Sequence, residues 1–91
     1  MEMNQKLEFY KSLDFMRLGQ AINRKQWQSA AMLIRRMEQK AKEAGVAEFE
    51  RSFAGLRQCI NRKDEREAKQ ILALVANKRA MYLNGQTSLD K

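Results

Sequence analysis

Two basic pairs are the residues of this 91-residue chain whose types and spacing first suggest chemistry. Arg24 and Lys25 follow an Ile-Asn dipeptide, and Arg62 and Lys63 follow the same dipeptide 38 positions later. Guanidinium and ammonium groups that converge attract anions such as carboxylates and phosphates. The formal net charge of +7 adds to that attraction. The chemistry that these pairs predict is therefore anion binding.

Catalytic chemistry has little support in the composition. The chain has no histidine, which removes the commonest general base and the commonest metal ligand. Its single cysteine, Cys59, has no histidine to activate it and no second cysteine for an internal disulfide. No glycine-rich phosphate-binding loop is present. We expect a protein that is not an enzyme and that has no metal site and no cofactor.

The elements that must position the basic pairs are helices. The chain contains no proline, only four glycines and many good helix formers. Apolar residues recur at helical spacing in four segments, about 6–22, 27–44, 46–60 and 64–84, with a possible restart of the first at Ser12 or Asp14. Leu7, Tyr10, Leu13, Met16, Leu18 and Ile22 supply the apolar residues of the first segment.

Local signals predict where these helices begin and end. Gly45 suits the left-handed backbone that follows a helix C-terminus. Asp64 with Glu67 three residues later predicts a capping box, and Asn84-Gly85 predicts the end of the last helix. Trp27 and Cys59 are expected to pack in the core.

Four amphipathic helices with short connections predict an all-α protein, an antiparallel up-down-up-down four-helix bundle. The offset of 38 residues between the two Ile-Asn-Arg-Lys sequences predicts two similar helical hairpins. One domain should span 1–91, with its core at about 6–84 and a polar tail at 85–91. In this bundle the first and third connections lie at one end, which brings both basic pairs together.

Two interpretations of the basic pairs remain open. In the first they are turn chemistry: asparagine tolerates the left-handed conformation, and cations favour the negative end of the preceding helix dipole. In the second they form an anion-attracting end, because the free N–H groups of the next helices also point there.

A further candidate surface lies on the second predicted helix, on the side opposite its apolar stripe. Met32, Arg36, Gln39 and Glu43 recur there at three- and four-residue spacing, with Arg35 on the shoulder of the apolar stripe. The candidate partner face consists of Met32, Arg35, Arg36 and Gln39. An exposed methionine beside two arginines is typical of a protein-binding face, although an ordinary polar surface fits the same residues.

The pattern resembles the histidine-containing phosphotransfer (HPt) domains of bacterial two-component phosphorelays. Ala44-Gly45-Val46 matches the turn between the central helices of that family, and Ile34–Ala41 then stands under its A-H-x-L-K-G-S motif. Met37 and Ala41 match apolar and small positions. Tetratricopeptide repeats are a poorer match, because the repeat length differs and the terminal proline is missing.

The same resemblance lacks the family's chemistry. Arg35 stands where the phosphorylated histidine belongs, and Glu38, Gln39 and Lys40 replace the lysine, glycine and serine of the motif. The resemblance implies a degenerate phosphotransfer domain that cannot accept phosphate but docks a response-regulator receiver through its first two helices.

The expected partner is consequently a protein with an acidic surface or a receiver domain. The alternative is a small basic nucleic-acid-binding protein that uses the two basic pairs, with Arg35 and Arg36. Acidic residues interrupt the basic ones along the chain, which favours the protein partner. We expect a cytoplasmic protein without membrane contact, because the sequence shows neither the apolar region of a signal peptide nor a membrane-spanning run. The expected oligomeric state is a monomer or a homodimer.

Overall fold

The computed structural model describes residues 4–89, and this part of the chain contains helices and no strand. The helices are α1 (Asn4–Lys11), α2 (Asp14–Asn23), α3 (Trp27–Glu43), α4 (Glu50–Arg62) and α5 (Glu65–Leu89). The prediction of an all-α protein is confirmed. Each of the four expected helical segments is present, and the first of them is divided into α1 and α2.

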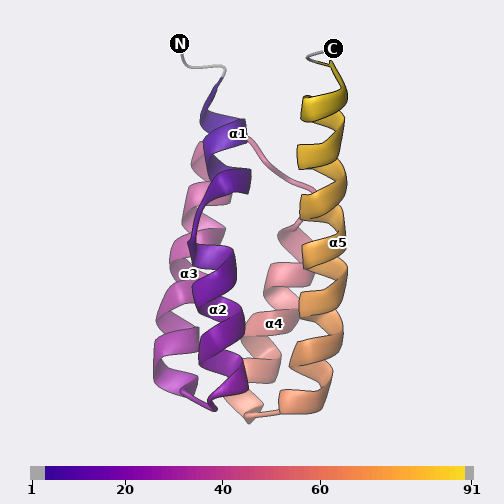
Figure 1. The fold of residues 1–91 in the computed structure, drawn as a ribbon. Coiled ribbons are helices and arrows are strands. Elements are labelled where there is room, and N and C mark those ends of the chain that lie inside the picture. The colour runs from indigo at the N-terminus through magenta and orange to yellow at the C-terminus, as the bar shows by residue number, and fades with distance from the viewer. Residues whose placement is uncertain (1–3, 90–91) are drawn as a thin grey trace.

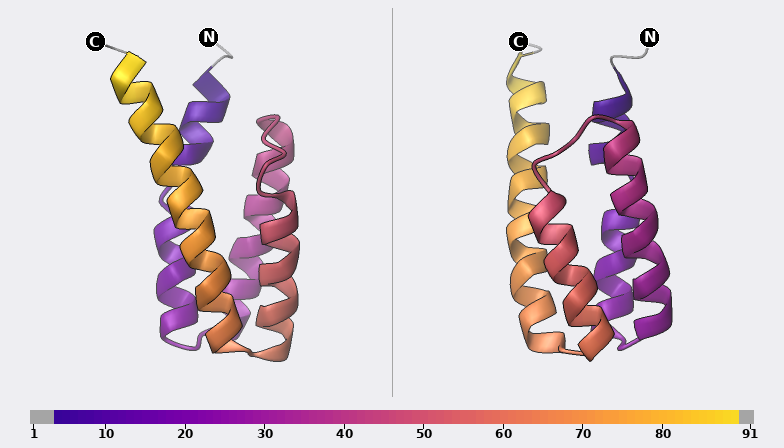
Figure 2. Two further views of the ribbon diagram at one scale, coloured as in Figure 1. Left: turned by 90° about the vertical axis from the view of Figure 1, so that its right-hand side faces the viewer. Right: turned by 180° about the vertical axis from the view of Figure 1, so that it is seen from behind.

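Successive long helices lie side by side and alternate in direction in Figures 1 and 2. The α2–α3 and α4–α5 connections meet at one end, whereas α1 begins and α5 ends toward the other (Figure 1). α3 contacts both α2 and α4, and α5 contacts α4, α2 and α1. Every helix therefore packs its apolar face against at least two others.

Two local hydrogen bonds pair backbone N–H groups at the break between α1 and α2. The Ser12 N–H donates to the Phe9 carbonyl at 3.1 Å, and the Ser12 hydroxyl accepts the Asp14 N–H at 3.1 Å. A serine hydroxyl commonly takes this position before a helix because the first N–H groups lack intrahelical partners. The predicted restart of the first helix is confirmed.

Arg79 of α5 also contacts the chain at this break, because α5 packs beside both α1 and α2. Its Nε donates to the Tyr10 carbonyl at 2.6 Å, near the end of α1 where intrahelical acceptors are left unpaired. Its guanidinium carbon also lies 5.1 Å from the centre of the Phe15 ring. Arg79 thus fixes the position of α5 against both parts of the divided helix.

The core is rich in aromatic rings at the break. Phe9 and Tyr10 are buried, and Phe15 packs against them. Leu13 and Met16, which the sequence placed among the apolar residues of one continuous helix, are more than half exposed. The continuous periodicity was wrong here, because the break turns α2 relative to α1 and brings the phenylalanines inward instead.

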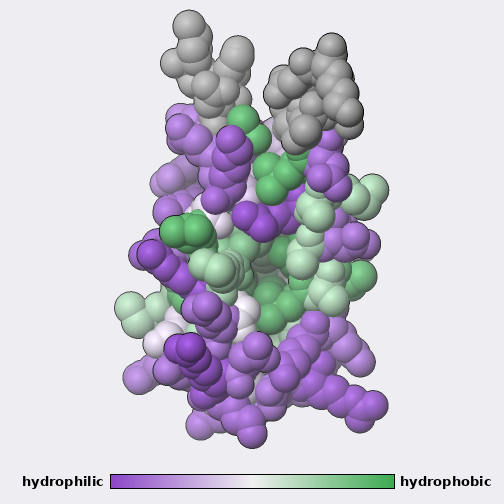
Figure 3. Space-filling model, in the orientation of Figure 1, coloured by the Kyte–Doolittle hydropathy of each residue, from purple (hydrophilic) through white to green (hydrophobic). Residues whose placement is uncertain are grey.

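Exposed apolar side chains are not confined to the break. Figure 3, in the orientation of Figure 1, shows apolar colour at mid-height over α2 and α5, with hydrophilic residues gathered at the lower end. Among residues 5–85, whose side chains the structure describes, the large apolar residues that are more than half exposed are Leu13, Met16, Met32, Leu74 and Met81. Within residues 4–89, no helix combines the length and apolar character needed to cross a membrane.

The last helix is longer than predicted. α5 continues through Asn84 and Gly85 to Leu89, so the predicted end of the last helix at Asn84-Gly85 was wrong; residues 90–91 of the expected polar tail lie outside the described residues. Tertiary packing holds the helix up to this signal, because Tyr82, two residues before Asn84, stacks on Tyr10 of α1 at 3.9 Å between ring centres. Glycine inside a helix costs only about 1 kcal/mol, so Asn84-Gly85 expresses a local preference that does not by itself end the helix.

The turn between α3 and α4 begins as the sequence predicted. Gly45 has a φ of 72°, as predicted for the residue after a helix C-terminus. The following helix begins at Glu50 rather than at Val46, but Val46 and Phe49 are still buried in the core. Trp27 packs against the core and Cys59 is buried within it, as expected.

Candidate functional site

The two basic pairs lie at the same end of the molecule, at the connections shown lowest in Figure 1. We call Arg24, Lys25, Arg62 and Lys63 the basic tip. The connections have the same hydrogen-bond pattern: the Gln26 N–H donates to the Ala21 carbonyl at 2.8 Å, and the Asp64 N–H donates to the Cys59 carbonyl at 2.9 Å. Each is the six-residue closure of a Schellman motif.

Lysine, not asparagine, adopts the left-handed conformation in both turns. Lys25 and Lys63 each have a φ of 57°, whereas Asn23 and Asn61 belong to α2 and α4. The assignment of this role to asparagine was wrong by two positions. A residue with a Cβ costs free energy in this conformation, on the order of 1 kcal/mol, so both turns carry strain that glycine would relieve.

Two of the four cations in the basic tip are paired with carboxylates. Lys25 lies 3.8 Å from Glu65, which ties one hairpin to the other, and Arg62 lies 3.1 Å from Glu67. Arg24 and Lys63 have no ion pair among residues 4–89. The tip therefore offers two unpaired cations rather than four.

The helix N-termini at the tip differ in their capacity to attract an anion. At α5, Asp64 Oδ1 accepts the Glu67 N–H at 3.1 Å, and the carboxylate of Glu67 turns to Arg62 instead of completing the predicted capping box. The pKa of Glu65 is lowered by the hydrogen bond from Lys69 and further by the charge of Lys25. α3 begins without a side-chain cap or an acidic residue. Of these two helices, α3 is the one whose first turn contains no acidic residue.

The candidate partner face forms an exposed stripe along α3. We call Met32, Arg35, Arg36 and Gln39 the α3 stripe; all four are exposed, and Met32 is 73% accessible. The structure divides the stripe, because Arg35 and Gln39 face α4 whereas Arg36 reaches α2. Gln39 also donates to Glu43 at 3.2 Å.

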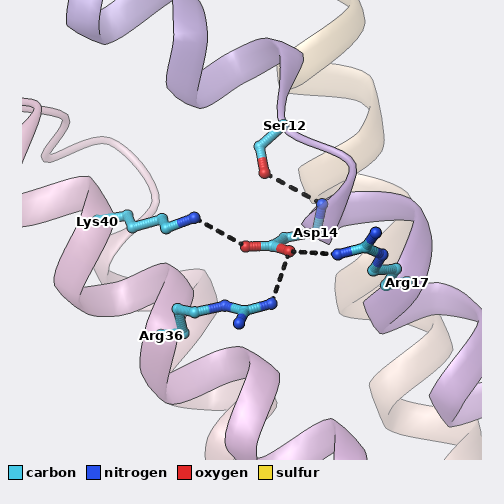
Figure 4. Close-up of polar contacts among 5 residues, drawn as sticks. All are labelled: Ser12, Asp14, Arg17, Arg36 and Lys40. Carbon is cyan, nitrogen blue, oxygen red and sulfur yellow. Dashed lines mark hydrogen bonds and ion pairs between the residues drawn. The ribbon is translucent and has the colours of Figure 1, made fainter.

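Asp14 is the reason why Arg36 turns away from the rest of the stripe. It is only 4% exposed, and its Oδ1 accepts a hydrogen bond of 3.0 Å from Arg36 Nη2. Lys40 lies 3.5 Å from Oδ2, and Arg17 lies 3.8 Å from Oδ1 (Figure 4). One buried carboxylate thus meets three cations that are each about half exposed.

Sequence reasoning missed this cluster. Asp14 was considered only as a residue that caps the restart, and Arg36 only as part of a partner face. The available signal was an acidic residue at the first position of α2, which also suits the positive end of the helix dipole. Nothing in the helical periodicity reveals that α3 places Arg36 and Lys40 opposite it.

A groove between α3 and α4 lies beside the stripe and has a volume of about 790 Å³. We call it the α3–α4 groove. Small and apolar residues line its floor: Ala41, Val46, Phe53 and Ala54. Five charged residues lie around it: Arg35, Glu38, Lys42, Glu50 and Arg57. The hollow arises because Ala41 and Ala54, on neighbouring helices, leave the space that larger side chains would fill.

The cations around this groove are weakly engaged. Arg57 lies 3.9 Å from Glu38, at the outer limit of an ion pair. Arg35 and Lys42 have neither an ion pair nor a side-chain hydrogen bond within the described range 4–89. An exposed pair contributes about 0–1 kcal/mol, so Arg57 exchanges its partner at little cost.

Cys59 is buried in the last helical turn of α4, next to the basic tip. Burial raises the pKa of its thiol above the ordinary value of 9.0, and the charge of Glu67 acts in the same direction. A thiol with a raised pKa is a poor nucleophile near neutral pH. Across residues 4–89, no cluster of three or more cysteine, histidine or acidic side chains is arranged to hold a metal ion.

Comparison with known proteins adds no relative: no protein-family model, no curated protein and no solved structure matches this chain.

Proposed function

We propose that the protein is a non-catalytic protein-interaction module, an antiparallel up-down-up-down bundle of two similar hairpins related to histidine-containing phosphotransfer domains. In this proposal it docks a signalling partner, a response-regulator receiver domain, through the α3 stripe. Arg35 then presents a permanent positive charge at the position where the family carries its phosphorylated histidine. No histidine elsewhere in the sequence could take over that role.

The observation that carries this proposal is the exposure of Met32 one helical turn before Arg35. Solvent-facing helix positions usually hold polar residues, and Met32 is the most exposed large apolar side chain among residues 5–85. Arg35 beside it has no ion pair within those residues. Methionine and arginine are both enriched at protein interfaces, where one supplies adaptable apolar contact and the other charged hydrogen bonds.

The test is a titration of isolated receiver domains into the protein, with affinity measured by calorimetry. Met32→Glu should weaken binding by about tenfold or more, because it places a charge at the centre of the contact. Met81→Glu is the matched control: Met81 is 67% exposed but lies on α5, and its variant should bind within about twofold of the parent. Equal effects of the two substitutions would refute docking at the α3 stripe.

The nucleic-acid alternative rests on Arg24 and Lys63 in the basic tip. Counterion release makes such binding steep in salt: four phosphate contacts lose about 100-fold in affinity between about 50 and 200 mM salt. Receiver docking should change by about threefold or less over the same interval. A steep salt dependence that disappears in the Arg62→Glu/Lys63→Glu variant would favour the nucleic-acid function instead.

A further inference from the structure

We infer that the α3–α4 groove binds an acidic amphipathic helix of a partner protein, whose apolar side chains fill the floor while its carboxylates meet Arg35 and Arg57. The inference rests on the proposed function in assigning the protein a protein partner, but it identifies a separate surface and the chemistry of what occupies it.

The shape of the groove favours a helix. α3 and α4 run side by side in opposite directions in Figure 2, and residues of both helices line the groove. The lining on α3 extends from Arg35 to Lys42, a distance of about 11 Å along a helix axis. Two to three turns of a third helix cover that length, and docking of an apolar helical face into such a groove is a common mode of peptide recognition.

The floor of the groove offers an apolar contact without rearrangement of the core. Ala41, Val46 and Phe53 are each less than 7% exposed and belong to the buried core. Ala54 is half-buried beside them. Because the first three residues expose almost no surface, the apolar surface that a partner leucine covers belongs mainly to Ala54 and to the exposed Ala47, at roughly 25 cal/mol for each Å² removed from water.

The charges around the groove favour a partner with negative charge. Three cations stand against the two carboxylates of Glu38 and Glu50, and the whole chain carries +7. Arg35 is without an ion pair within the described residues, and Arg57 holds Glu38 only at 3.9 Å. A partner carboxylate between these two arginines would gain charge-assisted hydrogen bonds that the isolated protein lacks. A basic helix would meet repulsion in the same place.

The probes are three synthetic peptides of about 15 residues, a length at which isolated helices begin to form. The first has leucines along one helical face and glutamates elsewhere; the second replaces the leucines by serine; the third replaces the glutamates by lysine. Binding is followed by fluorescence anisotropy, and its location by backbone amide chemical shifts. The acidic leucine peptide should bind with shifts at Ala41, Ala54 and Arg57, and both other peptides should bind at least tenfold more weakly.

Protein variants separate groove binding from general charge attraction. Arg57→Glu should weaken the acidic leucine peptide by about tenfold, whereas Arg66→Glu, the same charge change on an exposed residue of α5, should change it by about twofold or less. Ala54→Leu should also weaken binding, because the added side chain occupies the floor. Circular dichroism melting verifies that each variant is folded. If Ala54→Leu does not fold, Arg57→Glu alone decides the outcome.

Two results would overturn the inference: shifts confined to the basic tip, or equal losses in Arg57→Glu and Arg66→Glu. The proposed receiver docking is tested separately, because Met32 does not line the groove. Met32→Glu should leave peptide affinity unchanged even where it weakens a receiver. Failure of the peptides with retained receiver docking would therefore refute the groove and leave the proposed function in place.

Discussion

Oδ1 of Asp14 accepts a 3.0 Å hydrogen bond from Nη2 of Arg36, across 22 positions of sequence. The contact joins the first residue of α2 to the middle of α3, next to the break that divides the first predicted helix. Arg36 therefore serves the packing of the bundle, whereas Arg35, its neighbour in sequence, faces the α3–α4 groove. Adjacent arginines on one helix thus have different roles.

Replacement of Asp14 by asparagine should lower the free energy of unfolding by about 1–3 kcal/mol, because the buried carboxylate loses its charge-assisted contacts. The loss stays below that of a fully buried ion pair, since Arg36 and Lys40 are half exposed and regain water. Urea denaturation measures the effect. Glu43→Gln, a charge loss on an exposed residue, should change stability by about 0.5 kcal/mol or less.

A double-mutant cycle isolates the Asp14–Arg36 contact. Arg36→Met removes the guanidinium and keeps much of the side-chain volume, and the two substitutions together should show a coupling energy of about 1 kcal/mol. Additive effects of the two single substitutions would mean that the contact contributes nothing to folding.

Glycine in place of Lys63 should raise the free energy of unfolding by about 0.5–1 kcal/mol. The residue has a φ of 57° and no ion pair within residues 4–89, so the substitution relieves strain without removing a charge contact. Lys25→Gly should gain less, because Lys25 also contacts Glu65. Thermal melting monitors both variants.

Gly45→Ala is the converse test of the same turn geometry. The added Cβ meets no atom within 4 Å, so any cost comes from the φ of 72° alone. We expect a loss of about 1 kcal/mol. An unchanged melting temperature would indicate that the left-handed conformation is not retained at this position.

The carboxyl group of Glu65 should titrate below its ordinary value of 4.5, because the folded protein holds it in a hydrogen bond with Lys69 and near the charge of Lys25. A lowered folded-state pKa means that this group stabilises the protein above its unfolded-state pKa and loses that contribution as the pH falls through the folded-state value. Side-chain NMR titration measures the midpoint. Lys69→Met should raise it more than Lys25→Met, since the Lys69 hydrogen bond is the largest cause.

Cys59 should react slowly with thiol reagents at pH 8, at least about 100-fold more slowly than after denaturation, because burial both shields the thiol and raises its pKa. Cys59→Ala should fold well, since the equivalent position in the other hairpin is the buried Ala21. Cys59→Ser should cost about 1–3 kcal/mol if the new hydroxyl finds no partner. Rapid modification of the folded protein would contradict the buried position.

The later helices could be predicted because their apolar residues recur without interruption. α3 begins at Trp27 as expected, Gly45 adopts the left-handed conformation, and Asp64 accepts the predicted N–H from Glu67. These features depend on neighbours within a few positions of sequence. A local pattern therefore contains the information that they require.

The first helix and the end of the last could not be predicted in the same way. Tyr10 and Tyr82 stack at 3.9 Å although 72 positions separate them, and this contact accompanies the continuation of α5 through Asn84-Gly85. A turn signal in sequence states only a local preference of about 1 kcal/mol. A preference of this size does not by itself end a helix, so local sequence leaves the last turns of α5 undecided.

The sequence by itself determined that the chain is helical, which residues would be buried along α3 and α4, and that two basic pairs recur at a fixed offset. Only the tertiary structure decided what those cations do: Arg62 and Lys25 are paired with carboxylates, Arg36 is fixed by Asp14, and Arg35 is left beside an apolar groove. The physical reason is range. Helix formation follows contacts three or four residues apart, whereas the pairing of a charge depends on which distant helix packs beside it.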